Sequence, residues 1–175
     1  MNLEASVNDN LCSLSPQRIT LRPLQTRDLP QLDTWAQAID TRQFMSRCRP
    51  LTPSADKHAP ERGLLWLVIQ VDGADVGTVW LEKEASTPQA ILGIFIGVES
   101  WFGRGIGSEA ICQVLRVAQA TKFCTAVRLN VRQSNSRAIS CYRHCGFVVS
   151  HHGNKLMEDG SEMAYLTMCR QLWST

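Results

Sequence analysis

The sequence predicts an α+β (mixed α/β) fold, in which helices pack against one mixed, mostly antiparallel β-sheet of about seven strands. Two turn signals, Asp72-Gly73 and Ser86-Thr87-Pro88, separate apolar runs at 64–71, 76–84 and 89–98. Such runs are typical of consecutive antiparallel strands. Further along the chain, helical and extended periodicities alternate, which adds helices and more strands. The resulting element order is βα(α)βββαβαββ, without an internal repeat.

Length and composition indicate one globular domain. The chain has 175 residues, of which 44% are hydrophobic and 19% charged, so it can bury a sizeable core. Residues 1–17 are rich in Asn and Ser and lack periodicity, so we expect a flexible tail and a single domain over 18–175. The net charge of +2 gives no strong field, which argues against nucleic acid as a partner.

Several features predict a protein of the cytoplasm. The seven cysteines are an odd number without a CxxC pair, which favours reduced thiols over a secreted disulfide framework. The N-terminus, with Glu4 and Asp9, lacks the apolar core of a secretion signal. No apolar stretch approaches the roughly 20 residues of a membrane span. Cys141, His144 and Cys145 share helical spacing but lack a fourth ligand, so we expect no metal site.

The first part of the chain is expected to form a strand, a helix and a loop. Residues 18–24 alternate polar and apolar side chains, which is typical of a strand. Thr26 or Asp28 can cap a helix whose apolar positions recur every three or four residues. The segment 41–62 contains three prolines and an excess of Lys and Arg, so it is expected to be a loop with one short helix.

The second part is expected to alternate between helices and strands. One apolar stripe predicts a helix over 108–122, and a second helix is expected over 135–145, ended by Gly146. The remaining strands are expected at 125–131, 147–151 and 162–169.

The most informative motif is the glycine-rich turn Gly103-Arg-Gly-Ile-Gly107, between an expected strand and an expected helix. Glycine lets the main chain approach a ligand, and a helix start offers unpaired N–H groups and a positive dipole. Together these features favour a bound phosphate, although glycines also simply make tight turns. The turn is not a P-loop, because no Lys follows. It is not a dinucleotide motif either, because Ser108 follows it and it comes after the fourth strand.

A second motif downstream, taken with the first, carries a family resemblance. Its residues Asn135, Ala138, Tyr142, Gly146 and Phe147 have the spacing NxxAxxxYxxxGF, about 30 residues after the turn. The pair resembles the GCN5-related N-acetyltransferases (GNAT), and within them the branch that acetylates ribosomal-protein N-termini, polyamines and aminoglycosides. The resemblance covers 18–170. It implies the GNAT fold, with helices on both faces of the sheet and the fourth and fifth strands splayed apart.

The resemblance implies that acetyl-CoA binds in the wedge between these two strands. Main-chain groups of Phe95, Ile96 and Gly97 would hold the pantetheine arm, and Asn135 would reach the same arm. The amides of the turn would bind the pyrophosphate, with Arg104 adding positive charge. The turn residues concerned are Gly103, Arg104, Gly105, Ile106, Gly107 and Ser108.

The resemblance also implies that an amine attacks the thioester carbonyl directly. A main-chain N–H near Gly97 would stabilise the oxyanion, and Tyr142 would protonate the departing thiolate. A phenol with a pKa of about 10 can act as this acid at neutral pH, although a tyrosine here could simply be a core residue. Two positions depart from the family pattern. Phe102 stands where Arg or Gln is usual, and Asn130 stands where some relatives carry an acid.

The group that deprotonates the acceptor amine stays open. The candidates are Glu82, Glu84, Glu99, His151 and His152. Alternation places Trp80 and Glu82 on one strand face, which is either solvated or an anionic wall of the cleft. Asn130 cannot act as a base and would bind the acceptor or the main chain, while ordered water could relay the proton. We take Tyr142, Glu82 and Asn130 as the expected catalytic residues.

The identity of the acceptor is also open. A basic segment lies where this branch of the family builds part of the acceptor cleft, unless it is only a solvated loop. If it lines the cleft, it disfavours polycations. A peptide N-terminus, a polyamine, an aminoglycoside or a metabolite amine all fit the motifs, and a homodimer is possible. The alternative function is a module that binds acetyl-CoA without transferring its acetyl group. The basic residues are Arg42, Arg47, Arg49, Lys57, His58 and Arg62.

Overall fold

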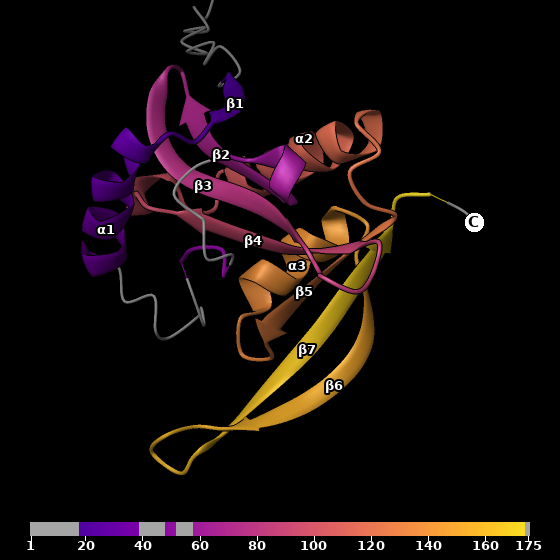
Figure 1. The fold of residues 1–175 in the computed structure, drawn as a ribbon. Helices are drawn as coiled ribbons and strands as arrows, with labels where there is room; N and C mark the ends of the chain where they lie inside the picture. Colours follow the sequence, from indigo (N-terminus) through magenta and orange to yellow (C-terminus); the bar gives the residue numbers. More distant parts are fainter. Residues whose placement is uncertain (1–17, 39–47, 52–57, 174–175) are drawn as a thin grey trace, which may run out of the picture.

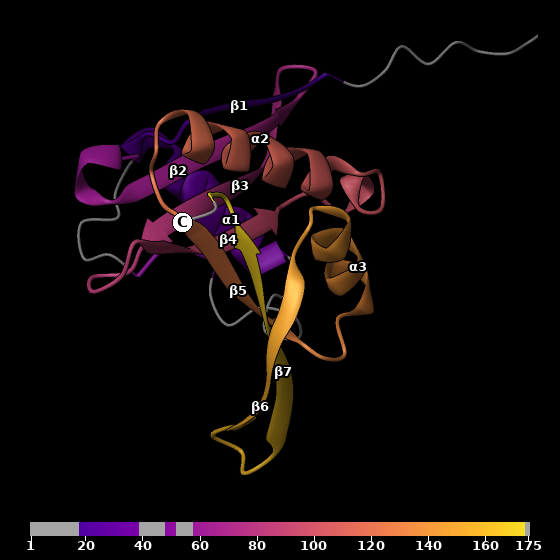
Figure 2. The same cartoon turned by 90° about the vertical axis from the view of Figure 1, so that its right-hand side faces the viewer.

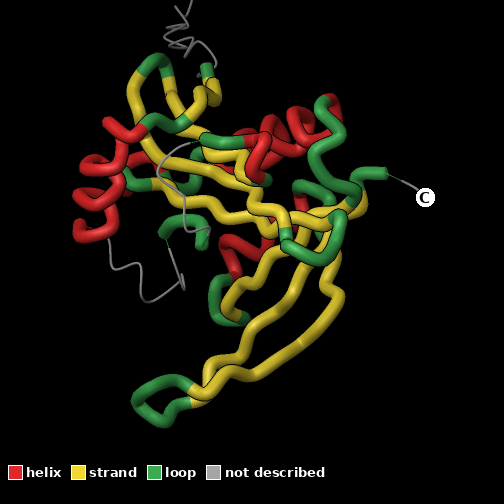
Figure 3. The backbone as a smooth tube through the Cα atoms, viewed as in Figure 1, coloured by secondary structure: helices red, strands yellow, loops and turns green. Residues whose placement is uncertain are grey.

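A seven-stranded sheet forms the centre of the computed structural model, which describes residues 18–38, 48–51 and 58–173 (Figures 1 and 3). The strand order is β1-β2-β3-β4-β5-β7-β6, and only β4 and β5 pair in parallel. This confirms the expected α+β class. The expected tail lies outside the described residues, whereas the described part of the segment 41–62 contains one short 3₁₀ helix, Pro60–Arg62. The strands are β1 (Ile19–Pro23), β2 (Leu64–Val71), β3 (Ala74–Lys83), β4 (Gln89–Ile96), β5 (Ala126–Arg132), β6 (Val148–Leu156) and β7 (Glu162–Gln171).

Helices cover both faces of the sheet (Figure 2). Helix α2 (Ile106–Ala120) packs its predicted apolar stripe against one face, and α3 (Ser136–His144) follows β5. Helix α1 (Leu29–Ala38) covers the other face, where the second apolar cluster lies. That cluster consists of Leu24, Leu32, Trp35, Leu64, Trp66, Val68, Trp80 and Phe95. In the described part of the chain, no helix is long and apolar enough to cross a membrane.

Most element boundaries differ by one or two residues from those expected, and two of the differences bear on the site. Helix α2 begins at Ile106 rather than at 108, because Gly105 adopts a left-handed φ of 78° and serves as the N-cap residue. Strand β6 continues to Leu156 rather than ending at 151, because it pairs with β7 as far as Glu162. The resulting β6–β7 hairpin projects beyond the rest of the sheet (Figures 1 and 2).

Strands β4 and β5 separate after a short paired stretch, as the fold class predicted. Their register runs only from Gln89↔Ala126 to Ile91↔Arg128, although both strands continue further. At the last pair, the guanidinium of Arg128 donates to both carboxylate oxygens of Glu84, at 2.9 and 2.5 Å. This ion pair closes one end of the gap between the strands and leaves the other end open.

Candidate functional site

A cleft of about 1250 Å³ opens where β4 and β5 diverge, bounded by the start of α2, by α3 and by the β6–β7 hairpin. Most of the predicted site residues line it, although they come from distant parts of the sequence. Those that line it are Phe95, Ile96, Gly103, Gly105, Ile106, Gly107, Ser108, Asn130, Asn135 and Tyr142. The predicted residues Glu82, Gly97 and Arg104 are not among the lining residues.

The start of α2 faces this cleft with free main-chain donors. Gly103 and Gly105 both have left-handed φ values, 73° and 78°, and a Cβ at either would meet no atom within 4 Å. Glycine is therefore required there by conformation rather than by space. The first α-helical bond of the described helix runs from Glu109 N to Gly105 O, at 3.1 Å. The three amides before it, from residues 106–108, have no intrahelical acceptor and can bind an anion.

Two arginines lie over aromatic rings beside this turn. The Arg104 guanidinium stacks 5.0 Å from the ring centroid of Trp101, and that of Arg137 lies 4.6 Å from the ring of Phe102. Phe102, which replaces the usual Arg or Gln, thus holds a cation from α3 near the turn. Arg137 also lines the cleft but was not predicted as a site residue, because nothing in its helical spacing marks it as one.

The main chain of β4 offers fewer free amides than expected. The Gly97 N–H donates to Val76 O at 2.8 Å, so it is not available for an oxyanion. Phe95 pairs with Thr78 of β3, and its side chain is buried on the α1 face. Because N–H directions alternate along a strand, the Ile96 amide points away from β3, toward the gap. Of the three predicted main-chain positions, Ile96 is the one whose N–H points toward the cleft.

Tyr142 projects from α3 into the cleft and is held by packing. Its ring meets Phe147 edge-on, with centroids 6.1 Å apart and planes inclined at 64°. Burial raises the pKa of the Tyr142 phenol, and the neighbouring thiols Cys141 and Cys145 raise it further. The phenol therefore stays protonated throughout the neutral range.

Thiols and a hydroxyl gather between α2 and α3, behind this tyrosine. Cys141 Sγ lies 3.1 Å from Ser108 Oγ, and the Cys145 thiol donates to Ser108 O at 3.5 Å. Hydrogen bonds from Cys145 and Ser108 lower the pKa of Cys141. The hydrogen bond with Cys141 in turn raises the pKa of Cys145. Within the described residues, no three His, Cys, Asp or Glu side chains are arranged to hold a metal.

Both predicted asparagines have defined internal partners. Asn135 is the N-cap of α3, and its Oδ1 accepts a bond from Ala138 N at 3.1 Å. Asn130, on β5, accepts a bond from Thr167 Oγ1 at 2.8 Å through its Oδ1. In each case the carboxamide oxygen is used internally. The NH₂ group is then the part of each side chain that can donate to a ligand.

Of the two alternatives for Glu82, the solvated strand face is wrong because the residue is buried, and Glu82 does not line the cleft either. Glu82 is 7% exposed and Trp80 is 1% exposed. A Glu82 oxygen accepts a bond from Leu51 N at 3.1 Å, which ties the preceding loop to β3. Glu84 forms the ion pair with Arg128, whose hydrogen bonds lower the pKa of that carboxyl group.

Of the three other candidates for the base, one lines the cleft and two do not. Glu99 lines it, just before the glycine-rich turn. His151 and His152 are exposed on β6 and do not line it. Glu99 is therefore the one carboxylate candidate that the described residues bring to the cleft.

The described part of the basic segment is not in the cleft. Arg49 pairs with Asp33 of α1, and His58 accepts a bond from Trp66 N at 3.0 Å. Arg62 is exposed beside β2 and does not line the cleft. The other members of the segment, Arg42, Arg47 and Lys57, lie outside the described residues.

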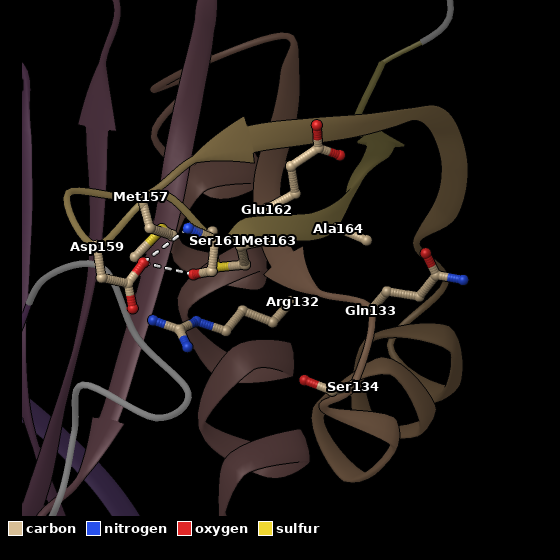
Figure 4. Close-up of a pocket in the computed structure, with 9 residues that line it drawn as sticks. All are labelled: Arg132, Gln133, Ser134, Met157, Asp159, Ser161, Glu162, Met163 and Ala164. Carbon is tan, nitrogen blue, oxygen red and sulfur yellow. Dashed lines mark hydrogen bonds between the residues drawn. The ribbon is translucent and has the colours of Figure 1, made fainter.

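A smaller cavity of about 440 Å³ lies between the end of β5 and the β6–β7 turn (Figure 4). The carboxylate of Asp159 accepts bonds from the amide and hydroxyl of Ser161, at 2.9 and 2.6 Å, which fixes this turn. Arg132 and Met163 line both cavities. No predicted site residue lines the smaller one.

Similar folds occur among solved acetyltransferases. Spermidine N-acetyltransferase from Vibrio cholerae, in complex with CoA and spermine, matches with a TM-score of 0.72 and 20% identity over 88% of this chain and 95% of that one. Aminoglycoside acetyltransferase AAC(6')-Ib, in complex with CoA and kanamycin, matches with 0.67 and 19% over 88% and 95%. RimJ of Mycobacterium smegmatis, in complex with CoA-disulfide, matches with 0.69 and 21% over 87% and 81%. These identities show a shared fold.

The family is established by sequence. No curated protein matches the chain. Residues 18–148 do match the family described as the acetyltransferase (GNAT) domain, and this range contains both sequence motifs completely. Because that match covers most of the chain, the protein belongs to the GNAT acetyltransferase family.

Proposed function

We propose that the protein transfers an acetyl group from acetyl-CoA to a primary amine, by direct attack in a ternary complex. One arrangement carries this proposal: the amide-rich start of α2 and the phenol of Tyr142 open into the same cleft between β4 and β5. The first can hold a pyrophosphate and the second can protonate a thiolate. The structural neighbours solved with CoA support the assignment of the cofactor.

The proposed cofactor contacts follow from the free groups of the cleft. The amides of residues 106–108 would bind the pyrophosphate, and Arg104 and Arg137 would add positive charge at the cleft entrance. The Ile96 amide would bond to the pantetheine arm or to the acetyl oxygen, and the Asn135 NH₂ would reach the same arm. Gly97 and Phe95 would support this strand without donating to the ligand, because their main-chain groups face β3.

The proposed chemistry needs one proton donor and one proton acceptor. As the amine nitrogen bonds to the acetyl carbon, the Ile96 N–H would stabilise the oxygen that gains charge. As the carbon–sulfur bond breaks, Tyr142 would give its proton to the thiolate and recover one from solvent. The ammonium proton would leave through water to Glu99, the candidate carboxylate that lines the cleft. Asn130 would orient the acceptor through its NH₂ group, and Glu82 would hold the loop at Leu51.

Mass spectrometry of acceptors tests the proposal directly. The chain has two tyrosines, and both line the cleft, so Tyr165→Phe is a matched control for Tyr142→Phe. Each protein is incubated with acetyl-CoA and a panel of peptides, polyamines, aminoglycosides and amino acids. We expect an acetylated acceptor whose formation falls more than about tenfold in Tyr142→Phe and stays within about threefold in Tyr165→Phe.

Binding of CoA, measured by calorimetry, separates the possible failures. Equal turnover by Tyr142→Phe would remove this residue from the mechanism. Tight CoA binding without transfer to any acceptor would favour the non-catalytic binding module. Absence of CoA binding to the wild-type protein would overturn both functions.

A further inference from the structure

Two buried tryptophans face each other across β2 and β3, and their indole N–H groups are treated differently. Trp66 and Trp80 are a register pair, 0% and 1% exposed. Trp66 Nε1 donates to Thr78 Oγ1 at 2.7 Å, and that hydroxyl donates to Leu67 O at 2.9 Å. Trp80 Nε1 is equally buried, yet it has no hydrogen-bond partner among the described residues.

Trp80 lies at the point where the cleft begins. It lines the cleft, and it pairs across the sheet with Gly93 of β4, two residues beyond the last β4–β5 pair. Its ring lies directly on Gly93, because a Cβ there would overlap the indole. The glycine thus lets the indole extend over β4 toward the opening between the strands. A phenylalanine could fill an apolar site, but it would not bring an N–H to this place.

The indole approaches the cleft from the acceptor side. Trp80 belongs to the apolar cluster under α1, whereas the start of α2, the proposed pyrophosphate site, is on the opposite face. A group that reaches the indole therefore belongs to the acceptor rather than to the nucleotide end of the cofactor. A buried N–H without a partner is unfavourable, and an oxygen from a ligand would remove this penalty.

The carboxylates beside Trp80 already have partners. Glu82 accepts a bond from the Leu51 amide, and Glu84 is held by Arg128. This end of the described cleft therefore offers donors, Trp80 and Asn130, in place of free carboxylates. Polycations bind to sites with free carboxylates, whereas a donor such as an indole N–H binds an oxygen.

We propose that Trp80 is a specificity residue whose indole N–H binds an oxygen of the acceptor, next to the amine that is acetylated. This inference rests on the proposed function. The acceptor class is then an amine with a nearby carbonyl, carboxylate or hydroxyl oxygen. Simple polyamines have no oxygen, so they would leave the Trp80 N–H without a partner and are expected to bind more weakly.

Nuclear magnetic resonance of nitrogen-labelled protein tests this directly. The chain has five tryptophans, so the indole region is simple, and Trp80→Phe and Trp66→Phe assign the two resonances. The wild-type protein, saturated with CoA, is titrated with alanine amide, alanine and alaninol, which carry three kinds of oxygen. Isobutylamine and putrescine serve as oxygen-free amines. We expect at least one oxygen-bearing amine to shift the Trp80 N–H downfield while the Trp66 N–H stays in place.

Kinetics supply the second readout. In Trp80→Phe we expect the KM for the oxygen-bearing acceptor to rise roughly three- to tenfold, with the KM for acetyl-CoA unchanged. In the control Trp66→Phe the Tm falls, because the bond to Thr78 is lost, but neither KM changes. A merely structural role of Trp80 would make the two variants alike.

The outcomes are distinguishable. If CoA binds and none of the three oxygen-bearing amines shifts the Trp80 resonance, the proposal is overturned while the proposed function stands. An equal response to putrescine would also overturn it. If CoA does not bind, the proposed function fails, and this inference fails with it.

Discussion

Substitution of Gly107 separates folding from cofactor binding. An added Cβ at this position would lie 3.8 Å from Cys141 Sγ and from Ile94 Cδ1, which is ordinary van der Waals contact. Gly107→Ala therefore fits without strain, and the loss of backbone freedom in the unfolded chain stabilises the helix by about 0.5–1 kcal/mol. For a chain of this size, that corresponds to a rise in Tm of about 1–4 °C.

Gly107→Val adds two methyl groups at the same place, between α3 and β4, where the cofactor phosphates are proposed to approach the main chain. Loss of two charge-assisted hydrogen bonds at about 1.5–3 kcal/mol each would weaken CoA binding more than about 100-fold. Calorimetric titration with CoA and thermal unfolding of wild type, Gly107→Ala and Gly107→Val measure both effects. We expect the alanine variant to bind CoA within a few-fold of wild type.

The valine variant decides the matter. If it unfolds at nearly the wild-type temperature and binds CoA with wild-type affinity, the pyrophosphate does not bind at this turn. Loss of binding together with a collapse in Tm would instead point to misfolding.

Three further results are expected. The Asp28 carboxylate accepts hydrogen bonds from Arg22 at 2.7 and 3.0 Å, which lower the pKa of Asp28 in the folded state. The pair therefore stabilises the folded protein above the unfolded pKa of about 3.9, and this stabilisation is lost as the pH falls through the lower folded pKa. Plots of Tm against pH should therefore fall more steeply in acid for wild type than for Asp28→Asn, and parallel curves would contradict this. Because the pKa of Cys141 is lowered, iodoacetamide at about pH 7 should alkylate it faster than Cys169, with protection by CoA; equal rates by peptide mass spectrometry would refute the assignment. Glu84→Gln should weaken the ion pair with Arg128 by about 1 kcal/mol and lower the Tm by about 2–4 °C, and an unchanged Tm would show that the pair contributes nothing.

Local patterns were sufficient to predict most of the framework. The turn signals at Asp72-Gly73 and Ser86-Thr87-Pro88 separate strands that the structure pairs antiparallel. The apolar stripe of α2 is buried along its length, because helix periodicity and burial are directly related. The glycine-rich turn was predicted to precede a helix start with unpaired N–H groups, and Gly105 is the N-cap residue of α2.

Features that depend on tertiary partners could not be predicted. Strand β6 is largely exposed on both faces, so its sequence has no alternation to mark its end at Leu156. Glu82 is buried where the loop at Leu51 bonds to it, and the strand pattern does not contain that contact. Whether Gly97 or Ile96 offers a free amide depends on the register of β4 against β3, and a shift by one residue would exchange them.

The early separation of β4 and β5 also leaves the sheet in two blocks, β1–β4 and β5–β7. One apolar core that includes α2 packs against both blocks. Across the sheet, three residue pairs and the ion pair of Arg128 join them. Main-chain groups of β4 and β5 that do not pair with each other line the gap, so the gap resembles a sheet edge. A ligand with amide groups can bind there as an additional strand would. Such a ligand would act as a clamp between the blocks. Hydrogen exchange would then slow on both sides of the gap when it binds.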